Sequence, residues 1–437
     1  MKEKAKKMNL LEDIIFFGEI KNTGEIYKIS NVTVNCSLKE GLALTSYESL
    51  SMNVPIVSSD VGGQKELISK DVGEIVKLMQ NEEDVYLEKY SPEEINSYVK
   101  AINKVLDNLE TYKSNCRKRI CENFTISKMI EKMDTERFRL YPDPEASLLV
   151  NELAEYYNVK PEQVFVGVGS DDVLGMAFLT CFNSEKPILF PDITYSFYDV
   201  WTELFKIPYK TVALDEQFKI NPWDFNKENG GIIFPNPNAP TAIEMPLEQV
   251  EEIIKNNPDV VVIVDEAYVD FGGHTALSLI DKYDNLLVVR TFSKSRAMAG
   301  MRIGYAFGSK ELIDAIKAVK FSYNSYTMNQ ATIETGVAAI KDDTYFKNTV
   351  SKIIETRENA KKELKKLGFS FTDSKTNFIF ATHERMHAKE IFEKLKKKNI
   401  FVRYFNKPGI DNYLRITVGT DEEMKKLYKA LQEILQK

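Results

Sequence analysis

The sequence is poor in the residues that build metal sites and disulfide frameworks. It has four cysteines and three histidines among 437 residues. No two cysteines form a CxxC pair, and His383 and His387 are spaced as metal ligands but lack an HExxH motif. We therefore expect no metal site and four unpaired thiols in a reducing cytoplasm.

Long apolar runs and excess positive charge are also missing. No run of about 20 apolar residues occurs, so no transmembrane helix is expected. The short apolar run near the N-terminus is broken by Glu12 and Asp13, unlike that of a signal peptide. The net charge of −7 argues against nucleic acid or an anionic membrane as a partner. The composition, 43% hydrophobic and 28% charged, is typical of a soluble globular protein.

The chain is too long for one ordinary domain, and its pattern changes near residue 136. Before that point, short strands alternate with helices. We predict strands at 13–17, 32–35 and 55–58 and helices at 46–52, 92–109 and 109–122. This pattern is typical of a small parallel sheet with helices, as in a nucleotide-binding half-domain.

After residue 136 a longer α/β pattern begins. Continuous apolar segments predict buried, mostly parallel strands at 163–168, 187–190, 231–234, 259–264, 285–290 and 302–307. The loops at the carboxyl ends of such strands meet at one crevice, where we expect the chemistry. A helix at 351–367 ended by Gly368, strands at 377–381, 401–404 and 413–418, a helix at 387–398 and a capping box at Thr420–Glu423 predict a small α+β domain.

The first segment carries two glutamates eight residues apart, Glu40 and Glu48, followed by the pair Gly62 and Gly63. We expect Glu48 near the start of its helix, where a carboxylate can accept both hydroxyls of a ribose, and the glycines allow a phosphate close to the backbone. In this order the motifs resemble the C-terminal half of retaining GT-B glycosyltransferases of the GT4 type, over residues 13–135. Because the acceptor half is absent, we expect a Rossmann-like half-domain that folds without catalysing transfer; nucleotide-sugar binding is the alternative.

In the second segment, charged residues follow successive predicted strands. Asp265 ends one strand, and an acid there is costly unless it meets a cation such as a protonated pyridine nitrogen. Lys294 follows the next strand among hydroxyl residues, and positive charge nearby favours an uncharged amine able to form an imine. Arg302, eight residues later, has a guanidinium that suits a phosphate.

Two further motifs fit a flat, phosphorylated ligand. Gly169, Ser170 and Asp171 lie between a strand and a helix, where backbone amides can cradle a phosphate. Tyr195 lies just beyond another strand and can stack on a flat ring. Each signal is weak alone, and their order along the chain carries the weight.

Taken together, residues 136–437 resemble the fold-type I pyridoxal-phosphate (PLP) aminotransferases, and closely the histidinol-phosphate aminotransferase family. The stretches that carry the resemblance are Tyr141-Pro-Asp-Pro-Glu, Gly169-Ser-Asp-Asp, Pro191-Asp-Ile-Thr-Tyr-Ser-Phe-Tyr, Asn236-Pro-Asn-Ala-Pro-Thr, Val264-Asp-Glu-Ala-Tyr, Phe292-Ser-Lys-Ser and Leu414-Arg-Ile-Thr-Val-Gly. The resemblance implies an α/β fold with a PLP-binding large domain at residues 136–330 and a small C-terminal domain at 331–437, after the half-domain at residues 1–135.

The resemblance also implies a role for each matching residue. Lys294 binds pyridoxal 5'-phosphate covalently and moves a proton, Asp265 keeps the ring nitrogen protonated, and Tyr268 bonds the ring hydroxyl. Tyr195 stacks on the ring, and the neighbouring subunit of a homodimer lends Tyr141 to the phosphate. Arg415 binds the substrate carboxylate and Arg403 its phosphate end. The cofactor phosphate is surrounded by Ser170, Asp171, Thr291, Ser293 and Arg302.

The sequence departs from this family in two places. Ala239 stands where the family has an asparagine that bonds the ring hydroxyl, and Ala242 stands where it has a glycine. Asn236 or Asn238 is a candidate substitute, and we take Asn238 as a cofactor-binding residue. The family's N-terminal arm, which crosses the dimer, is replaced by the glycosyltransferase-like segment.

The sequence therefore predicts a cytoplasmic PLP-dependent aminotransferase of histidine biosynthesis. It would act on small molecules: glutamate or 2-oxoglutarate, and a phosphorylated amino alcohol or ketone. Two alternatives stay open. One is a related chemistry on the same scaffold, decarboxylation of threonine phosphate or transamination of another aromatic or sugar-pathway compound. The other is a catalytically inactive nucleotide-sugar-binding or scaffold protein.

Overall fold

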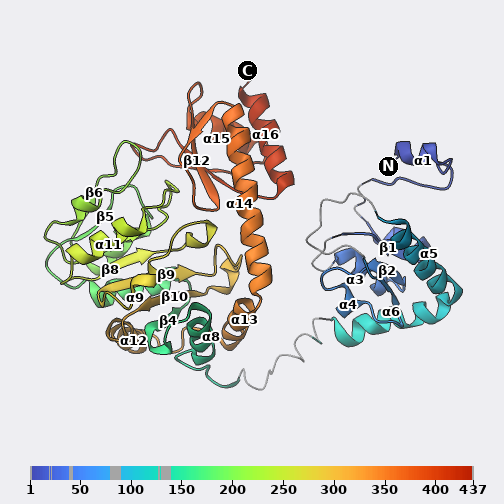
Figure 1. The fold of residues 1–437 in the computed structure, drawn as a ribbon, viewed down its shortest axis with the longest axis horizontal. Helices are drawn as coiled ribbons and strands as arrows, with labels where there is room; N and C mark the ends of the chain where they lie inside the picture. Colours follow the sequence, from blue (N-terminus) through green and yellow to red (C-terminus); the bar gives the residue numbers. More distant parts are fainter. Residues whose placement is uncertain are drawn as a thin grey trace. The chain divides into compact units, whose positions relative to one another are not determined.

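The computed structural model describes residues 2–18, 20, 22–38, 43–78, 90–125, 128 and 139–435. The chain forms two compact units, Met1–Arg139 (the N-terminal unit) and Leu140–Lys437 (the C-terminal unit), and each is described by itself (Figure 1). In the described part of the chain, no helix has the length and apolar character needed to span a membrane.

The N-terminal unit is built on a parallel sheet in the order β1-β2-β3. Its described elements are α1 (Lys2–Lys7), α2 (Gly24–Ile29), β1 (Thr33–Asn35), α3 (Leu44–Ser51), β2 (Ile56–Ser59), α4 (Gln64–Leu67), β3 (Gly73–Val76), α5 (Pro92–Asp107) and α6 (Leu109–Asn123). A capping box formed by Ser91 and Glu94 begins α5. Two small clusters fill the sheet's two faces, one around Ile56 and Cys116 and the other around Val57 and Tyr98.

The strand predicted at 13–17 is wrong. These residues form turns and irregular chain, and the side chains of Ile14, Ile15 and Phe17 are exposed. A short apolar run becomes a strand only when a neighbouring strand bonds it, and the sheet of this unit begins with β1.

The C-terminal unit contains a seven-stranded sheet in the order β4-β10-β9-β8-β7-β5-β6. Every neighbouring pair is parallel except those of β10, which runs antiparallel to β4 and β9. The sheet is therefore mostly parallel, as predicted, and the sequence did not reveal β6. Its strands are β4 (Val164–Gly167), β5 (Ile188–Pro191), β6 (Tyr209–Val212), β7 (Ile232–Pro235), β8 (Val262–Asp265), β9 (Leu286–Thr291) and β10 (Gly304–Gly308).

Helices cover both faces of this sheet, which explains its continuous apolar strands. One core cluster joins the sheet to α8 (Ser147–Tyr157), α11 (Leu247–Asn256) and α13 (Gln330–Lys341). The other joins it to α9 (Ser170–Cys181), α10 (Phe197–Phe205) and α12 (Lys310–Tyr323). Short 3-10 turns lie at Pro161–Gln163, Pro222–Phe225, Val269–Phe271, Ala276–Leu279 and Ala299–Met301.

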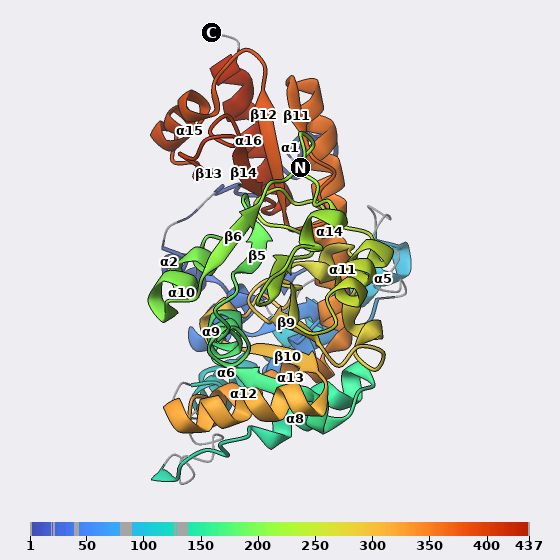
Figure 2. The same ribbon diagram turned by 90° about the vertical axis from the view of Figure 1, so that its left-hand side faces the viewer.

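The rest of the C-terminal unit is a small antiparallel sheet in the order β11-β12-β14-β13, with helices packed on it. Figure 2 shows α15 and α16 beside this sheet. The helix predicted at 351–367 begins earlier, because the Asp342 side chain caps it, and Gly368 follows its end at φ +86°. These elements are α14 (Asp343–Lys366), β11 (Phe369–Phe371), β12 (Phe378–His383), α15 (Ala388–Lys397), β13 (Arg403–Tyr404), β14 (Leu414–Thr417) and α16 (Asp421–Leu435).

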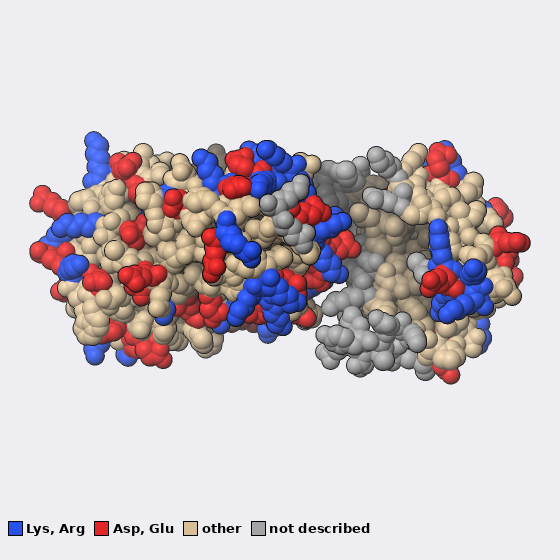
Figure 3. Space-filling model, turned by 90° about the horizontal axis from the view of Figure 1, so that it is seen from above, with Lys and Arg blue, Asp and Glu red and all other residues tan. Residues whose placement is uncertain are grey.

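The surface carries both signs of charge. Figure 3 shows lysine and arginine side chains mixed with aspartate and glutamate across the visible face. The net charge of the whole chain is −7.

Candidate active site

The topology of the large sheet gathers the predicted motifs at one edge. Asp265 ends β8 and Thr291 ends β9, and these parallel strands finish side by side. Because β10 runs the other way, its first residue, Gly304, pairs with Thr291 and with Gly167 at the end of β4. The segments that follow β4, β8 and β9 and the one that precedes β10 therefore meet at this edge.

A cavity of about 560 Å³ opens at this edge. It is lined by residues of the large sheet's loops and by residues of the small domain. Five of the predicted site residues share its wall: Tyr195, Tyr268, Lys294, Arg403 and Arg415.

Lys294 lies in the loop after β9, and its Nζ is 5.4 Å from the centre of the Tyr268 ring. Among the described residues, no carboxylate lies within ion-pair distance of this amine. The amine is thus available to a ligand in the cavity, whereas a lysine on the surface would be solvated or paired.

Asp265 is buried, and both of its carboxylate oxygens accept a hydrogen bond. Tyr198 Oη donates to Oδ2 at 3.0 Å, and the backbone amide of Ala267 lies 3.2 Å from Oδ1. Burial raises the pKa of Asp265 from 3.8 to about 6, while these two hydrogen bonds act in the opposite direction. A buried carboxylate of this kind is a binding site for a cation.

The first turn of α9 and Arg302, the two parts of the predicted phosphate cradle, lie close together. Gly169 has φ +89°, and a Cβ there would lie 2.4 Å from Arg302 Nη2. A Cβ on Gly304 would lie 2.3 Å from Ser170 N, so two glycines bring the guanidinium close to the helix N-terminus. This combination of backbone amides and a guanidinium suits a phosphate.

Side chains at the edge of the cradle are connected to one another. Asp171 accepts a hydrogen bond from Tyr195 Oη at 2.8 Å and lies 3.5 Å from Arg302 Nη2. Thr291 Oγ1 donates to the carbonyl of Ile303 and accepts from the amide of Ser293. The loop that carries Lys294 is therefore bonded to the segment that carries Arg302.

The small domain contributes two arginines to the same cavity. Arg403 and Arg415 are paired opposite each other on β13 and β14, so they share one face of that sheet. The guanidinium of Arg415 lies 5.0 Å from the Phe378 ring, and its Nε is buried without a hydrogen-bond partner among the residues that the structure describes. An orphaned donor on a cavity wall is satisfied when an anion binds.

Three predicted residues have other surroundings. Tyr141 lies outside this cavity, 81% exposed, with its ring stacked on that of Tyr326. Asn236 is bonded to both backbone groups of Met245. Asn238 is bonded to Thr194, Thr241 and the carbonyl of Ile193. Asn236 therefore holds its own loop together, and Asn238 also ties that loop to the segment that follows β5.

Ala239 and Ala242 occupy an apolar corner of the site. They pack with Phe378, and the Tyr268 ring lies against them. Ala242 has φ +65°, the left-handed conformation that glycine adopts without strain. The corner where the resemblance expects an asparagine thus presents a methyl group beside Tyr268.

Of the paired glutamates of the N-terminal unit, the structure describes Glu48. Glu40 lies outside the described residues. The expected position of Glu48 near the start of its helix is wrong: Glu48 is the fifth residue of α3, and its carboxylate accepts a hydrogen bond from Tyr27 Oη at 3.3 Å. The helix begins two residues earlier than predicted, because Ala43 precedes it in an extended conformation.

Tyr198 and the buried ion pair Glu266–Arg290 were not predicted from the sequence. Glu266 directly follows Asp265 in the chain, and its carboxylate lies 2.8 Å from Arg290 Nη2. Arg290 Nη1 lies 3.7 Å from Asp270. This ion pair ties the ends of β8 and β9 together. The available signals were the acid that follows Asp265 and the tyrosine three residues after Tyr195.

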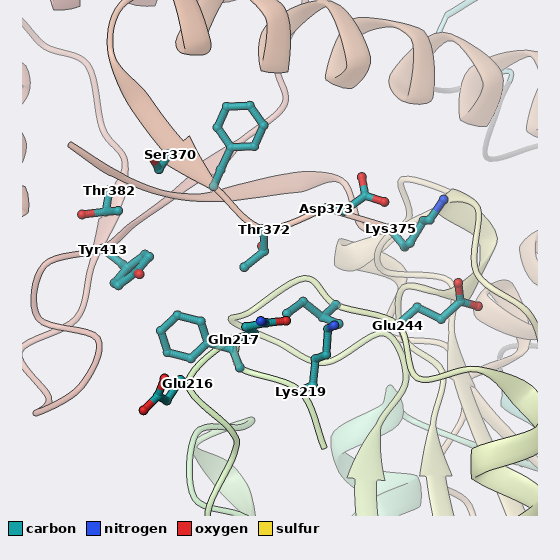
Figure 4. Close-up of a pocket in the computed structure, with 13 residues that line it drawn as sticks. Glu216, Gln217, Lys219, Glu244, Ser370, Thr372, Asp373, Lys375, Thr382 and Tyr413 are labelled. Carbon is teal, nitrogen blue, oxygen red and sulfur yellow. The ribbon is translucent and has the colours of Figure 1, made fainter. Parts of the chain in front are cut away.

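A second cavity of about 580 Å³ lies between the 216–219 loop and the small domain (Figure 4). Its wall includes Lys219, Glu244, Thr372, Lys375 and Tyr413. None of the predicted site residues lines it.

Comparison with known proteins shows the family of this chain. Residues 114–431 match the family model described as aminotransferase class I and II. The chain belongs to this family. Histidinol-phosphate aminotransferase 1 of Hydrogenovibrio crunogenus is 52% identical over 300 residues, which cover 69% of this chain and 84% of that protein. The aminotransferase fold therefore accounts for the C-terminal unit.

Solved structures confirm the predicted fold class. The histidinol-phosphate aminotransferase of Clostridium acetobutylicum has a TM-score of 0.65 at 23% identity, covering 72% of this chain and 96% of that one. The Sinorhizobium meliloti enzyme, solved with pyridoxal-5'-phosphate, has a TM-score of 0.64 at 23% identity, covering 70% and 86%. Residues 1–119 match the model for glycosyl transferases group 1, as the N-terminal motifs predict.

Proposed function

We propose that this aminotransferase family member exchanges the amino group between histidinol phosphate and 2-oxoglutarate, with pyridoxal phosphate as cofactor. The observation that carries the proposal is the single cavity that contains the amine of Lys294 and the guanidinium groups of Arg403 and Arg415. Relatives named histidinol-phosphate aminotransferase at about 50% identity support the substrate class.

The residues at the sheet edge fit this cofactor. The two glycines and Arg302 leave room for a phosphate at the start of α9. The buried Asp265 suits a protonated ring nitrogen, and Tyr195 and Tyr268 line the space between. We assign the phosphate contacts to Ser170, Asp171, Thr291, Ser293 and Arg302.

When bound, the cofactor supplies an electron sink for the carbon that carries the amino group. Lys294 Nζ would hold it covalently and, once released, would remove a proton at one carbon and return it at another. Asp265 would keep the ring nitrogen protonated. Tyr268, beside the Ala239 methyl group, would be the donor for the ring hydroxyl. Tyr195 would cover the ring, and its hydroxyl is fixed by Asp171.

The two arginines of the cavity suit the two kinds of anionic group on the proposed substrates, a carboxylate and a phosphate. We assign Arg415, with its unpartnered Nε, to the carboxylate of glutamate or 2-oxoglutarate. Arg403 meets the phosphate of the other substrate. Lys407 lines the same cavity and is held by the carbonyl of Asp192, so it adds positive charge at that end.

We further propose a homodimer in the cytoplasm. Tyr141, stacked on Tyr326, leaves a large aromatic face in contact with solvent, and Tyr323 is similarly exposed. A partner subunit covering this surface would bring Tyr141 to its own cofactor phosphate. The four free cysteines suit a reducing compartment. Sedimentation velocity of wild type and Tyr141→Asp tests the assembly, since a buried charge would weaken it.

For the N-terminal unit we propose a folded half-domain without transferase activity. The hydrogen bond from Tyr27 engages the Glu48 carboxylate, and residues 1–119 account for the match to glycosyl transferases. The domain boundaries at residues 135 and 330 remain part of this proposal.

The test is a substrate exchange assay with purified protein and pyridoxal phosphate. Histidinol phosphate and 2-oxoglutarate should together yield glutamate, and each alone should yield none. Carbon dioxide released from threonine phosphate without 2-oxoglutarate would instead support the decarboxylase. Protein that binds no cofactor would support the scaffold alternative.

A further inference from the structure

We propose that Tyr198 is a positioning residue that holds the Asp265 carboxylate in one orientation and in its ionised form, ready for the protonated ring of the cofactor. The inference rests on the proposed function, because it concerns the same acid. It adds a residue that acts through Asp265 and lies outside the cavity wall.

The geometry fixes the carboxylate from two sides. Tyr198 is fully buried at the start of α10, and its Oη lies 3.0 Å from Asp265 Oδ2. The amide of Ala267 lies 3.2 Å from Oδ1. Rotation of the carboxylate about its Cβ–Cγ bond would break both hydrogen bonds. One free lone pair on either oxygen is then presented in a fixed direction.

The tyrosine ring is itself held in place by aromatic neighbours. Its centre lies 5.7 Å from that of Tyr195, 5.9 Å from Phe190, 6.2 Å from Phe178 and 6.3 Å from Trp201. These contacts set the position of the hydroxyl and do not depend on it. A phenylalanine at position 198 would keep the packing and remove only the hydrogen bond.

The charges around Asp265 show why this donor matters. Burial is the largest influence and raises its pKa, and Asp171 on α9 raises it further. The hydrogen bonds of Tyr198 and Ala267 and the charge of Lys294 lower it. The Tyr198 phenol, whose own pKa is raised well above 10 by burial, remains a donor throughout the working pH range. Loss of this donor therefore shifts Asp265 toward the neutral acid near pH 7.

The experiment compares Tyr198→Phe with Tyr156→Phe in the full chain. Tyr156 also donates to a carboxylate, Asp343 at 2.6 Å, and takes no part in the proposed site. The dissociation constant of pyridoxal phosphate is measured for cofactor-depleted protein from about pH 5.5 to about pH 9. The same measurement on Asp265→Asn, and on the double variant that carries both Asp265→Asn and Tyr198→Phe, completes a double-mutant cycle.

Tyr198→Phe should weaken cofactor binding at neutral pH about tenfold, the scale of one hydrogen bond to a charged group. The acid limb of its affinity profile should move to higher pH. Tyr156→Phe should leave both unchanged, and Tyr198→Phe should have no further effect on top of Asp265→Asn. The inference would be overturned if Tyr198→Phe kept the affinity and pH profile of the wild type. It would also be overturned if Tyr198→Phe weakened cofactor binding equally in protein that carries Asp265→Asn. Either result would leave the proposed function intact. Wild-type protein that binds no cofactor would overturn both.

Discussion

The two units of this chain carry motifs that are equally easy to read in the sequence, but their motifs lie differently in space. In the C-terminal unit the motifs lie at or near the ends of neighbouring strands, and the seven-stranded sheet brings Asp265, Lys294 and Arg302 to one edge. In the N-terminal unit, Glu48 lies within a helix and bonds Tyr27 of the same unit. A sequence motif indicates the family from which a segment descends. A functional site requires polar groups that lack hydrogen-bond partners and face the same cavity.

The units also differ in the shell that supports their polar groups. In the C-terminal unit the buried ion pair Glu266–Arg290 and the packed rings of Tyr195 and Tyr198 support the strand ends near Asp265. The N-terminal unit has three short strands and small core clusters. Small cores leave less free energy to hold groups in strained or desolvated positions.

Lys294→Ala should abolish covalent cofactor binding and lower amino transfer by about 10⁴-fold or more, as expected when the group that forms the covalent bond is lost. Absorbance spectra and the exchange assay measure both. Lys310→Ala, which removes an exposed ion pair with Asp314, is the matched control and should retain both properties. Substantial turnover by the Lys294 variant would remove the basis for the contrast between the units.

Arg415→Ala should lower kcat/KM for glutamate by about 100-fold, because a charge-assisted contact to the carboxylate is lost. Arg403→Ala should impair histidinol phosphate by a similar factor and leave the glutamate half-reaction nearly unchanged. Half-reaction kinetics with each substrate separate the two effects. If both variants impaired both half-reactions equally, the assignment of the two arginines to different anions would be wrong.

Asp265→Asn should stabilise the cofactor-free protein above about pH 6. Burial raises the pKa of Asp265 from 3.8 to about 6 in the folded state, so folding takes up a proton between these values. The stability that this group contributes is present below pH 3.8 and is lost as pH rises to about 6. The ionised, buried acid then costs about 1–3 kcal/mol, which the asparagine avoids.

Urea unfolding at about pH 4.5 and about pH 8 measures this difference. The advantage of the Asn variant should be larger at the higher pH. Asp314→Asn, at an exposed position, should show no such trend. An Asn variant less stable than wild type at high pH would mean that the buried charge is fully compensated without cofactor.

Ala242→Gly should raise the free energy of unfolding by about 0.5–1 kcal/mol, because Ala242 has φ +65° and glycine accepts that conformation without strain. Ala338→Gly, on the exposed side of α13, should do the opposite by a similar amount. Denaturant curves of both variants provide the comparison, and the same sign for both would contradict the backbone argument.

Glu48→Ala should leave amino transfer within about twofold of wild type, since the residue belongs to the other unit and its lost bond to Tyr27 is worth about 1 kcal/mol or less. The exchange assay and a thermal melt are sufficient to show this. A large loss of amino transfer would show that the two units are coupled, contrary to this expectation.

Much of the C-terminal fold could be predicted from the sequence, because apolar strands buried on both faces are long and continuous. The strand predicted at 13–17 was wrong because no strand in the described part of the chain pairs with it. The motif residues Asp265, Lys294 and Arg302 could be found because each lies at or near the end of a predicted strand. Tyr198 could not, because its role depends on a hydrogen bond across 67 residues, which no local pattern encodes. The hydrogen bonds of Asn238 to Ile193 and Thr194 were hidden for the same reason.

The most direct test of the central claim is chemical. Protein loaded with pyridoxal phosphate is reduced with borohydride, digested and mapped by mass spectrometry. The account predicts a stable phosphopyridoxyl group on the peptide that contains Lys294, and none on peptides of residues 1–139. A label on another lysine, or no label on any peptide, would contradict it.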